Sequence, residues 1–448
     1  MSIQRPQYPF DVRHADVWKI ALPASVAFIT EPLVGIVDIA VIGRLGDAGL
    51  LGGLVLGALV FDVLFSLAYF LRIGTAGLVA QAVGARDPSD GLLHVSRALV
   101  LGFGISLLMI VLAQPILWGS EALLAPEPGV ASALSAYFFV RIASAPFSLI
   151  NYALLGWFYG RAAARTGMML QIMLHGINIL ASVALVYGLG WGVAGAAAGT
   201  VLGQIVAALA GLFILVRHYG GARAMLARLS LADMLDATAV RRMFGLSRDL
   251  MIRSIALMSA YAWFAAQGSR MGEVPLAANA VLLNLLMVVG FFLDGIAQAA
   301  EQLTGKAIGA NWRPAFDKAY GLSMIWGLII ASSLGLVWYL TGPWLIGFMT
   351  TNEAVRAHAL DYLPLAALCA LTFMPAVVYD GILIGTTQNV LMRNGMLISL
   401  LIFAVAALSL QPLGNAGLWL ALHCWFLGRG MIYWLGLERR RPHLFAQA

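Results

Sequence analysis

The stretch EPLVGIVDIAVIG, residues 31–43, is apolar apart from two carboxylates, Glu31 and Asp38. It lies in the first of twelve apolar segments, and a membrane-spanning helix needs about 20 apolar residues. Hydrophobic residues make up 61% of the 448 and charged residues 11%, against about 25% charged residues in soluble domains. The sequence therefore predicts an all-α polytopic membrane protein with twelve transmembrane helices at residues 16–43, 48–80, 92–118, 130–159, 166–189, 192–217, 246–271, 276–308, 318–341, 357–387, 390–411 and 415–437.

The 27 lysines and arginines, which give a net charge of +6, are distributed unevenly. Most of them, Arg429 included, are assigned to the termini and to the connections after even-numbered segments, whereas Arg72, Arg141 and Arg253 lie inside segments. Because cytoplasmic loops carry the excess of basic residues, we expect a multi-pass protein of the cytoplasmic (inner) membrane with both termini cytoplasmic. The basic charge then reflects topology, and no nucleic acid partner is expected.

An internal repeat divides the chain into two halves. Residues 218–245 form the longest polar connection, a cytoplasmic linker between an N-lobe (1–217) and a C-lobe (246–448) of six segments each. The sequence VGA at 83–85 is matched by IGA at 308–310, and GWFYG at 156–160 is matched at the same offset by GILIG at 381–385. Since six is even, both halves enter the membrane from the same side. Such a parallel repeat is typical of transporters whose substrate site lies between the halves.

Asp38 is the polar residue whose position inside an apolar segment most needs a physical explanation. A charged side chain at the centre of a membrane helix costs roughly 2.5–3.5 kcal/mol on insertion scales, and a polar cavity is the usual reason. Pro23 and Pro32 lie in the same segment, and proline kinks a helix, so we expect a bend near the carboxylates. A carboxylate here can take up a proton or bind a cation, and either event can bias a helix that has two positions.

Further polar side chains lie inside the segments. Gln171, His175, Asn178 and Ser182 form a stripe at i, i+4, i+7 and i+11, which hydrogen bonding between helices would also explain. Structural ion pairs are preferred for Asp62, Arg72, Arg141, Arg253 and Glu301, because charges of both signs are present. The candidates for polar residues that line a cavity are Glu31, Asn151, Asp294 and Asp380.

The motifs of common enzyme classes are missing from the sequence. There is no Walker A loop, no GxGxxG after a strand, no HExxH and no GxSxG. The two cysteines, Cys369 and Cys424, form no CxxC motif, and the seven histidines show no ligand spacing. We therefore expect no enzyme activity, no cofactor and no metal centre.

Several of these motifs together resemble the multidrug and toxic compound extrusion (MATE) family, and within it the DinF-like branch. They are EPLVGIVD at 31–38 with Ile42-Gly43, FLRIGTAGLVAQA at 70–82, NAVLLN at 279–284, LDGIA at 293–297, and Asp380-Gly381 followed by Met392-Arg393-Asn394. The resemblance runs through nearly the whole chain. It implies the MATE fold, with twelve helices in two pseudo-symmetric six-helix lobes, and export of amphipathic, often cationic compounds driven by H⁺ or Na⁺.

The resemblance also implies a coupling site. In the family's first lobe, an aspartate of span 1 works with an asparagine of span 5, an aspartate one turn later and a threonine of span 6. Asp38, Asn178 and Thr200 match these positions, and Pro23 matches the proline at which span 1 is thought to bend. The second aspartate falls on Ser182, which can hydrogen-bond but supplies no negative charge. We therefore favour H⁺ as the coupling ion, with Na⁺ at Asp38 as the alternative.

The leading interpretation is a cation-coupled antiporter that exports drug-like or toxic organic compounds by alternating access, as a monomer in the bilayer. One alternative is an exporter of a metabolite or organic anion, or a lipid-linked flippase, of the same superfamily. Anionic cargo would be favoured if Arg72, Arg141 and Arg253 face the cavity. A further alternative, an intramembrane enzyme or a scaffold, has no catalytic constellation to support it.

Overall fold

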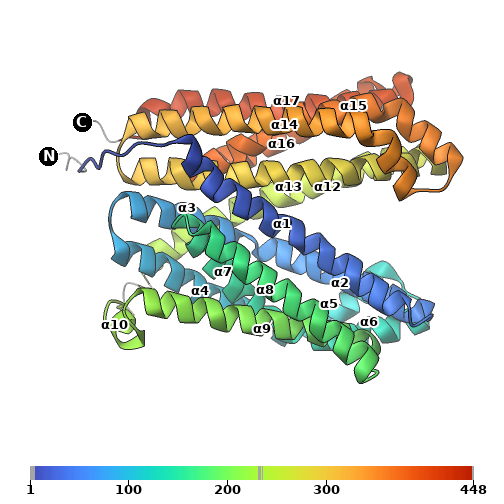
Figure 1. Cartoon of the computed structure of the whole chain (residues 1–448), viewed down its shortest axis with the longest axis horizontal. Coiled ribbons are helices and arrows are strands. Elements are labelled where there is room, and N and C mark those ends of the chain that lie inside the picture. The colour runs from blue at the N-terminus through green and yellow to red at the C-terminus, as the bar shows by residue number, and fades with distance from the viewer. Residues whose placement is uncertain (1–5, 231–233, 235, 446–448) are drawn as a thin grey trace. The chain divides into compact units, whose positions relative to one another are not determined.

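The computed structural model describes residues 6–230, 234 and 236–445, and the regular elements in this part of the chain are helices (Figure 1). Residues 231–233 and 235 of the predicted linker lie outside the described residues. The helices of the N-terminal half are α1 (His14–Gly43), α2 (Ala48–Ala68), α3 (Phe70–Gly84), α4 (Pro88–Val111), α5 (Ala113–Leu124), α6 (Pro128–Arg141), η1 (Ile142–Ser144), α7 (Ala145–Gly160), α8 (Ala164–Val183), η2 (Ala184–Gly188), α9 (Gly192–His218) and α10 (Ala222–Leu226).

The C-terminal half continues the same architecture. Its elements are α12 (Ala237–Arg270), α13 (Glu273–Gly309), α14 (Arg313–Met349), α15 (Glu353–Gly385), α16 (Asn389–Ser409), η3 (Gln411–Leu413), α17 (Gly414–Arg440) and η4 (Arg441–His443). Each of the twelve predicted segments is helical over most of its length, which confirms the prediction of secondary structure.

The number of membrane spans is where the structure differs from the sequence analysis. Within the described residues, ten helical stretches are long and apolar enough to cross a membrane, not twelve. Segments 246–271 and 415–437 are helical as α12 and α17, but they are not among the ten. Both carry an arginine inside the helix, Arg253 and Arg429 respectively, and these two arginines line a pocket described below.

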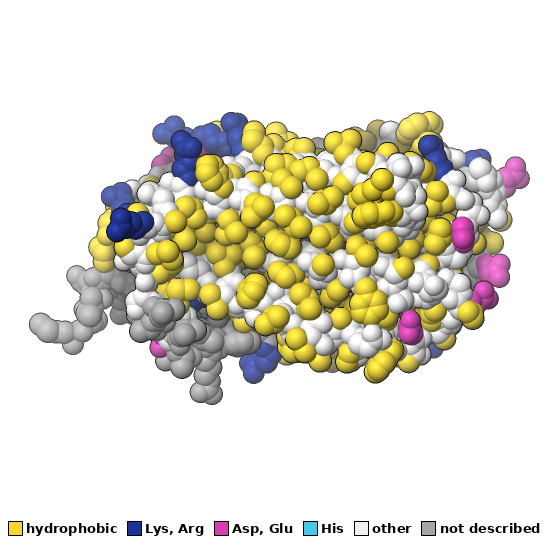
Figure 2. Space-filling view, turned by 90° about the horizontal axis from the view of Figure 1, so that it is seen from below, with side chains coloured by type: hydrophobic (Ala, Val, Ile, Leu, Met, Phe, Trp, Pro, Cys, Tyr) yellow, Lys and Arg dark blue, Asp and Glu magenta, His cyan; other side chains and the backbone are white. Residues whose placement is uncertain are grey.

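The surface of the helices is apolar along most of their length. Large side chains such as Leu180 (73% exposed) and Phe213 (63%) are exposed. Hydrophobic side chains cover the middle of the face that Figure 2 shows, and Lys, Arg, Asp and Glu gather mainly toward its left and right sides. Outward-facing apolar side chains are costly in water and favourable in lipid, so this surface fits the hydrocarbon region of a bilayer.

Contacts divide the chain into two compact units. The N-terminal unit contains Val26–Val79 and Asp87–Met243, and the C-terminal unit contains the described residues of Met1–Ser25, Ala80–Arg86 and Phe244–Ala448. The division within α1 falls two residues after Pro23, although α1 is one continuous helix. The division into lobes 1–217 and 246–448 stays a prediction, and the contacts add 6–25 and 80–86 to the C-terminal unit.

Glycines of the internal repeat give each unit the same helix crossing. In the N-terminal unit, a Cβ atom added at Gly156 or Gly160 of α7 would lie within 3 Å of the α3 backbone, at Arg72 and Ala76. In the C-terminal unit, a Cβ at Gly381 or Gly385 of α15 would meet the α13 backbone in the same way, at Ala297 and Glu301. The second pair of glycines follows the first at the offset of the internal repeat. The repeat is therefore a repeat of backbone contacts, which only glycine permits.

A second pair of repeat glycines lies in the C-terminal unit. A Cβ at Gly84 would lie within 3 Å of the backbone of Lys306 and Ala310, and one at Gly309 would lie as close to the backbone of Gln81. The amide of Gln81 also donates a hydrogen bond to the carbonyl of Gly385 (2.8 Å). The ends of α3 and α13 thus touch through equivalent glycines, which explains why residues 80–86 belong to this unit.

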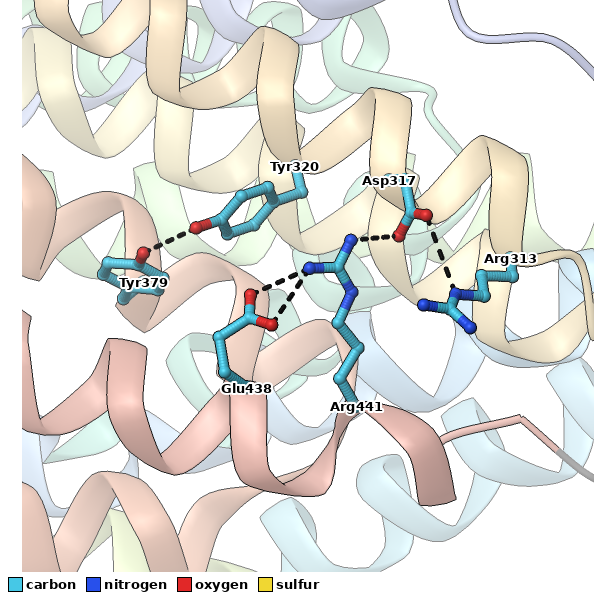
Figure 3. A network of polar contacts seen from close by, with 6 residues as sticks. All are labelled: Arg313, Asp317, Tyr320, Tyr379, Glu438 and Arg441. Atoms are coloured by element: carbon cyan, nitrogen blue, oxygen red, sulfur yellow. Dashed lines mark hydrogen bonds and ion pairs between the residues drawn. The ribbon is translucent and has the colours of Figure 1, made fainter.

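Polar contacts join the ends of three helices in the C-terminal unit (Figure 3). Arg441, just beyond α17, donates hydrogen bonds to Asp317 of α14 (2.6 Å) and to both carboxylate oxygens of Glu438 (2.9 and 3.1 Å). The hydroxyls of Tyr320 and Tyr379 lie 2.7 Å apart and connect α14 to α15. Charged groups at helix ends stay near the membrane–water interface, where their hydration is not lost.

The glycine contact predicts a difference between two substitutions on α3. Gly84→Ala should lower the stability of the purified protein by about 1–3 kcal/mol, because the new Cβ would push the α13 backbone away. Gly74→Ala is the control, since no heavy atom lies within 4 Å of its added Cβ, and it should leave the stability equal or slightly higher. Thermal unfolding in detergent measures both, and equal midpoints would contradict the assigned role of Gly84.

Candidate functional site

Asp38 lies in the N-terminal unit, in the part of α1 that follows the division of the chain. Its side chain is buried (8% exposed), and its Oδ1 has no hydrogen-bond partner among the described residues. One turn later, the hydroxyl of Tyr187 in the π-helical turn η2 donates a hydrogen bond to the carbonyl of Val41 (2.9 Å). This bond fixes α1 beside the end of α8, close to the polar residues of that helix.

Asn178, Ser182 and Thr200 form one hydrogen-bonded group between α8 and α9. The amide of Asn178 donates to the hydroxyl of Thr200 (3.1 Å), and the hydroxyl of Ser182 lies 3.1 Å from Asn178 Oδ1. The carbonyl of Ala196 accepts from Thr200 (3.2 Å) and lies 3.3 Å from the Ser182 hydroxyl. All three side chains are buried. Two residues of the predicted polar stripe on α8, Asn178 and Ser182, thus form hydrogen bonds to the neighbouring helix α9.

Ser182 is the member of the network that acts on Asp38. Its hydroxyl bonds Asn178 and the Ala196 carbonyl, and both this hydroxyl and the charge of the Arg141 guanidinium influence the Asp38 carboxyl. Arg141 itself bonds the Ser144 hydroxyl and faces the ring of Phe61 at 5.3 Å. The structure therefore brings Asp38, Ser182, Asn178 and Thr200 together, with one cation nearby.

Glycines of α9 make this proximity possible. A Cβ at Gly199 would lie within 3 Å of Ser182, and one at Gly203 would lie within 3 Å of the Leu174 carbonyl. Gly195, one turn earlier, meets the η2 backbone at 3.1 Å. Small residues at every fourth position allow two membrane helices to approach backbone to backbone. Because α8 and α9 are so close, short side chains suffice to connect them.

The other polar candidates of the N-terminal unit lie apart from this network. Asn151 is buried and donates hydrogen bonds to the side-chain oxygen (2.7 Å) and the backbone carbonyl (3.0 Å) of Gln204. Glu31 is exposed, and the charge of Arg72 acts on it. Arg72 lies over the ring of Tyr69, 4.4 Å from the centroid. Gln204 was not singled out in the sequence, since a lone glutamine in an apolar run carries no pattern.

A partly open pocket of about 200 Å³ is lined by residues of the C-terminal unit. Its charged lining consists of Arg253, Arg429, Asp294 and Asp380, and the rest of its wall is apolar and aromatic, with Leu257, Tyr261, Leu283, Leu286, Met287, Gly290, Phe291, Phe373 and Val377. Arg253 forms an ion pair with Asp380 at 2.5 Å, and Arg429 lies 3.9 Å from the same carboxylate oxygen. Two of the four predicted cavity residues, Asp294 and Asp380, thus line this cavity, whereas Glu31 and Asn151 belong to the other unit.

The placement of Arg429 corrects the sequence analysis, which counts it with the cytoplasmic charges. Arg429 is 1% exposed and lies within α17, between Trp425 and Tyr433 of the same helix. Its position inside the predicted segment 415–437 was the available signal. The count of basic residues obscured it, because charge counting takes no account of which way a side chain points.

Within the described part of the chain, no group of three His, Cys, Asp or Glu side chains is placed to hold a metal ion. Asp38 is the one carboxylate of its network, and the oxygens around it already take part in hydrogen bonds to one another. The arrangement can bind or release a single cation at the Asp38 carboxyl, and a proton needs no further ligands.

The chain is similar to known proteins both in sequence and in structure. A family model described as MatE matches residues 23–184 and again residues 250–412. The DNA damage-inducible protein F of Escherichia coli (strain K12) is 34% identical over 427 residues, 93% of this chain and 90% of that protein. The multidrug export protein MepA of Staphylococcus aureus (strain NCTC 8325 / PS 47) is 22% identical over 369 residues, 82% of this chain and 81% of that protein. A crystal structure of MATE in the bent conformation matches with a TM-score of 0.83 at 17% identity, over 97% of this chain and 99% of that one.

The network predicts the effect of removing its central member. Asn178→Ala leaves the hydroxyls of Ser182 and Thr200 buried without their partner, which should lower stability by about 1–3 kcal/mol. Leu180→Ala on the same helix is the control, because Leu180 is 73% exposed to the surroundings. Unfolding of both variants in detergent measures this difference in stability. If Asn178→Ala is as stable as Leu180→Ala, the network does not hold α8 to α9.

Proposed function

The chain belongs to the MATE family of multidrug and toxic compound exporters, and on this premise we propose that it is an H⁺-coupled antiporter for drug-like organic compounds. As a member of that family it is a multi-pass membrane transporter, not an enzyme, and its substrates are small organic molecules. The identity of the coupling ion, the residues that bind it and the direction of the chain in the membrane are parts of the proposal.

The observation that carries the proposal is the buried Oδ1 of Asp38, which has no hydrogen-bond partner among the described residues. A buried charge without sufficient partners is costly, and a proton removes that charge. Release of the proton restores it, so the two states of Asp38 differ in the free energy of the surrounding helices. That difference is what an ion-coupled transporter needs in order to drive a conformational change.

Two features support H⁺ over Na⁺ at this site. A hard cation such as Na⁺ favours several oxygen ligands with net negative charge. Ser182 stands where the family has a second carboxylate. The side-chain oxygens of Asn178 and Thr200 already accept hydrogen bonds, from Ser182 and Asn178 respectively, and Thr200 donates to the Ala196 carbonyl. A proton, by contrast, binds one carboxylate oxygen covalently and needs no coordination shell.

The position of Asp38 on α1 supports its role in coupling. Residues 14–25 of this helix belong to the C-terminal unit and residues 26–43 to the N-terminal unit, and Pro23 lies next to the division. Ser25 donates a hydrogen bond to the carbonyl of Phe292 (3.3 Å), which anchors the first part of α1 to α13. We propose that protonation of Asp38 changes how the second part of α1 packs, with Pro23 as the bend. Substrate would then leave as the proton enters.

Location and assembly follow the same proposal. The predicted distribution of basic residues supports an inner-membrane protein with both termini in the cytoplasm. The protein is proposed to work as a monomer, because each chain already contains both repeats of the fold.

The first test concerns Asp38. Asp38→Asn keeps the size and polarity of the side chain but cannot take up a proton, so export should fall to the level of cells without the protein. Asp361→Asn, an exposed carboxylate on α15, should export normally. Efflux of ethidium from a host that lacks its own pumps measures both, alongside the amount of protein in the membrane. Normal efflux by Asp38→Asn would refute the assignment.

The second test separates the ions. In proteoliposomes, a pH gradient at equal Na⁺ on both sides should drive ethidium movement, and a Na⁺ gradient at equal pH should not. The physical reason is that the single carboxylate of this network can hold a proton but gives Na⁺ too few free oxygens. Ethidium movement under the Na⁺ gradient alone would overturn H⁺ coupling.

A further inference from the structure

The end of α9 and the short helix α10 carry arginines that have no partner in the chain. Arg217 lies in the last turn of α9, Arg223 lies in α10 and Arg228 follows it, and α10 lies at the end of α9 (Figure 1). All three side chains are exposed, and among the described residues none of them has an ion pair or a hydrogen bond. Since each guanidinium has five N–H donors, these groups can bind a partner from outside the chain.

Two glycines fold α10 back toward the end of α9. Gly220 and Gly221 have positive φ angles of 86° and 101°, a conformation that glycine adopts readily. The amide of Gly221 donates to the carbonyl of Val216 (2.9 Å), and a Cβ added at Gly220 would lie 3.6 Å from the Cβ of Ala224. The turn therefore keeps Arg223 close to the last turn of α9.

The carboxylates of the neighbouring segments are fewer than the arginines. Residues 128–232 contain no aspartate and no glutamate. Tyr219 donates to the carbonyl of Pro88 (3.4 Å), which brings the start of α4 beside the turn. There, Asp87 accepts from two amides of the first turn of α4 (3.0 Å each), and Asp90 forms an ion pair with the histidine one turn later (3.3 Å).

A count of the charged groups at this end of the N-terminal unit includes these two carboxylates and that of Asp236, which has an interaction of its own. Against these three stand five arginines of the described residues: Arg161, Arg165, Arg217, Arg223 and Arg228. This end of the unit therefore keeps an excess of positive charge, and the three arginines around α10 carry it on the surface.

An apolar stripe on α9 leads up to Arg217. Leu202, Val206, Leu209 and Phe213 are all exposed, Phe213 by 63%. Arg217 continues the row at the same spacing of three or four residues, so the five side chains lie on one face of the helix. Such an apolar face is suited to lipid chains, and long basic side chains near the ends of membrane helices reach the headgroups.

We propose that this surface binds an anionic glycerophospholipid, with its phosphate on Arg217, Arg223 and Arg228 and an acyl chain along the stripe of α9. Basic clusters directly after a membrane helix attract anionic headgroups, and guanidinium groups bind phosphate oxygens with charge-assisted hydrogen bonds. A bound lipid holds this end of α9 at the membrane surface. The site lies in the N-terminal unit and does not depend on the coupling role proposed for Asp38.

The experiment compares two lipids with identical chains, phosphatidylglycerol and phosphatidylcholine. Native mass spectrometry of the delipidated full-length protein should show tighter binding of phosphatidylglycerol. The triple variant Arg217→Gln, Arg223→Gln, Arg228→Gln should lose that preference, because each arginine removed weakens binding of the anionic headgroup by roughly fivefold. A triple variant that keeps the full preference would exclude this surface as the site.

A matched variant tests whether net charge alone explains the loss. Arg44→Gln, Arg270→Gln, Arg439→Gln removes the same charge at three other exposed arginines, and it should prefer phosphatidylglycerol as the unmodified protein does. An equal loss of preference in both triple variants would show that the arginines around α10 form no site, and would overturn the proposal.

Two further measurements test whether the ligand is a lipid and not a free phosphate. Glycerol 3-phosphate, which has no acyl chains, should not displace phosphatidylglycerol even in large excess. Phe213→Ala should weaken the binding of both lipids, because it shortens the apolar stripe, whereas Leu180→Ala, an exposed position on α8, should not. Displacement by glycerol 3-phosphate, or unchanged lipid binding by Phe213→Ala, would refute the assignment of a lipid to this site.

Discussion

The contact on which the rest of this structure depends is the approach of one helix backbone to another at glycine. In a bilayer every backbone polar group must be satisfied within its own helix, and apolar side chains gain little by leaving lipid for another helix. Close packing must then come from small residues. Gly156 and Gly160 provide it between α7 and α3, and Gly381 and Gly385 provide it between α15 and α13. The polar groups can be short and sparse because these crossings bring their helices so close.

Much of the fold could be predicted from the sequence because lipid imposes a simple rule on composition. All twelve predicted segments are helical over most of their length, and the weak sequence matches between the two halves proved to be glycine contacts. Two of the twelve predicted spans, α12 and α17, are helical but are not among the ten helical stretches of the described residues that are long and apolar enough to cross a membrane. These two helices face the cavity with an arginine each, and a scale of mean hydropathy cannot distinguish an inward arginine from one at a helix end.

The candidate sites were predictable to different degrees. Asp38 could be found because a carboxylate in an apolar run is costly, whereas Asn178, Ser182 and Thr200 were assigned to its site only through the resemblance to the family. Arg429 was assigned to the wrong environment, since its neighbours in the cavity, Asp380 and Arg253, come from two other helices, α15 and α12. Proximity between residues so far apart in the chain depends on tertiary packing. The pairing of Asn151 with Gln204 escaped detection for the same reason.

The even number of segments in each half has a historical consequence. A segment of chain that begins and ends on the same side of the membrane can be copied end to end without any change in its charged loops, since the copy inserts in the same direction. The duplicated glycines would then have brought the helix crossings with them, already formed. A fold of this kind can arise in one genetic step from a six-helix ancestor, and the two copies are afterwards free to diverge in chemistry. Asp38 in the network of one half, and Arg253 and Arg429 around Asp380 in the other, fit that divergence.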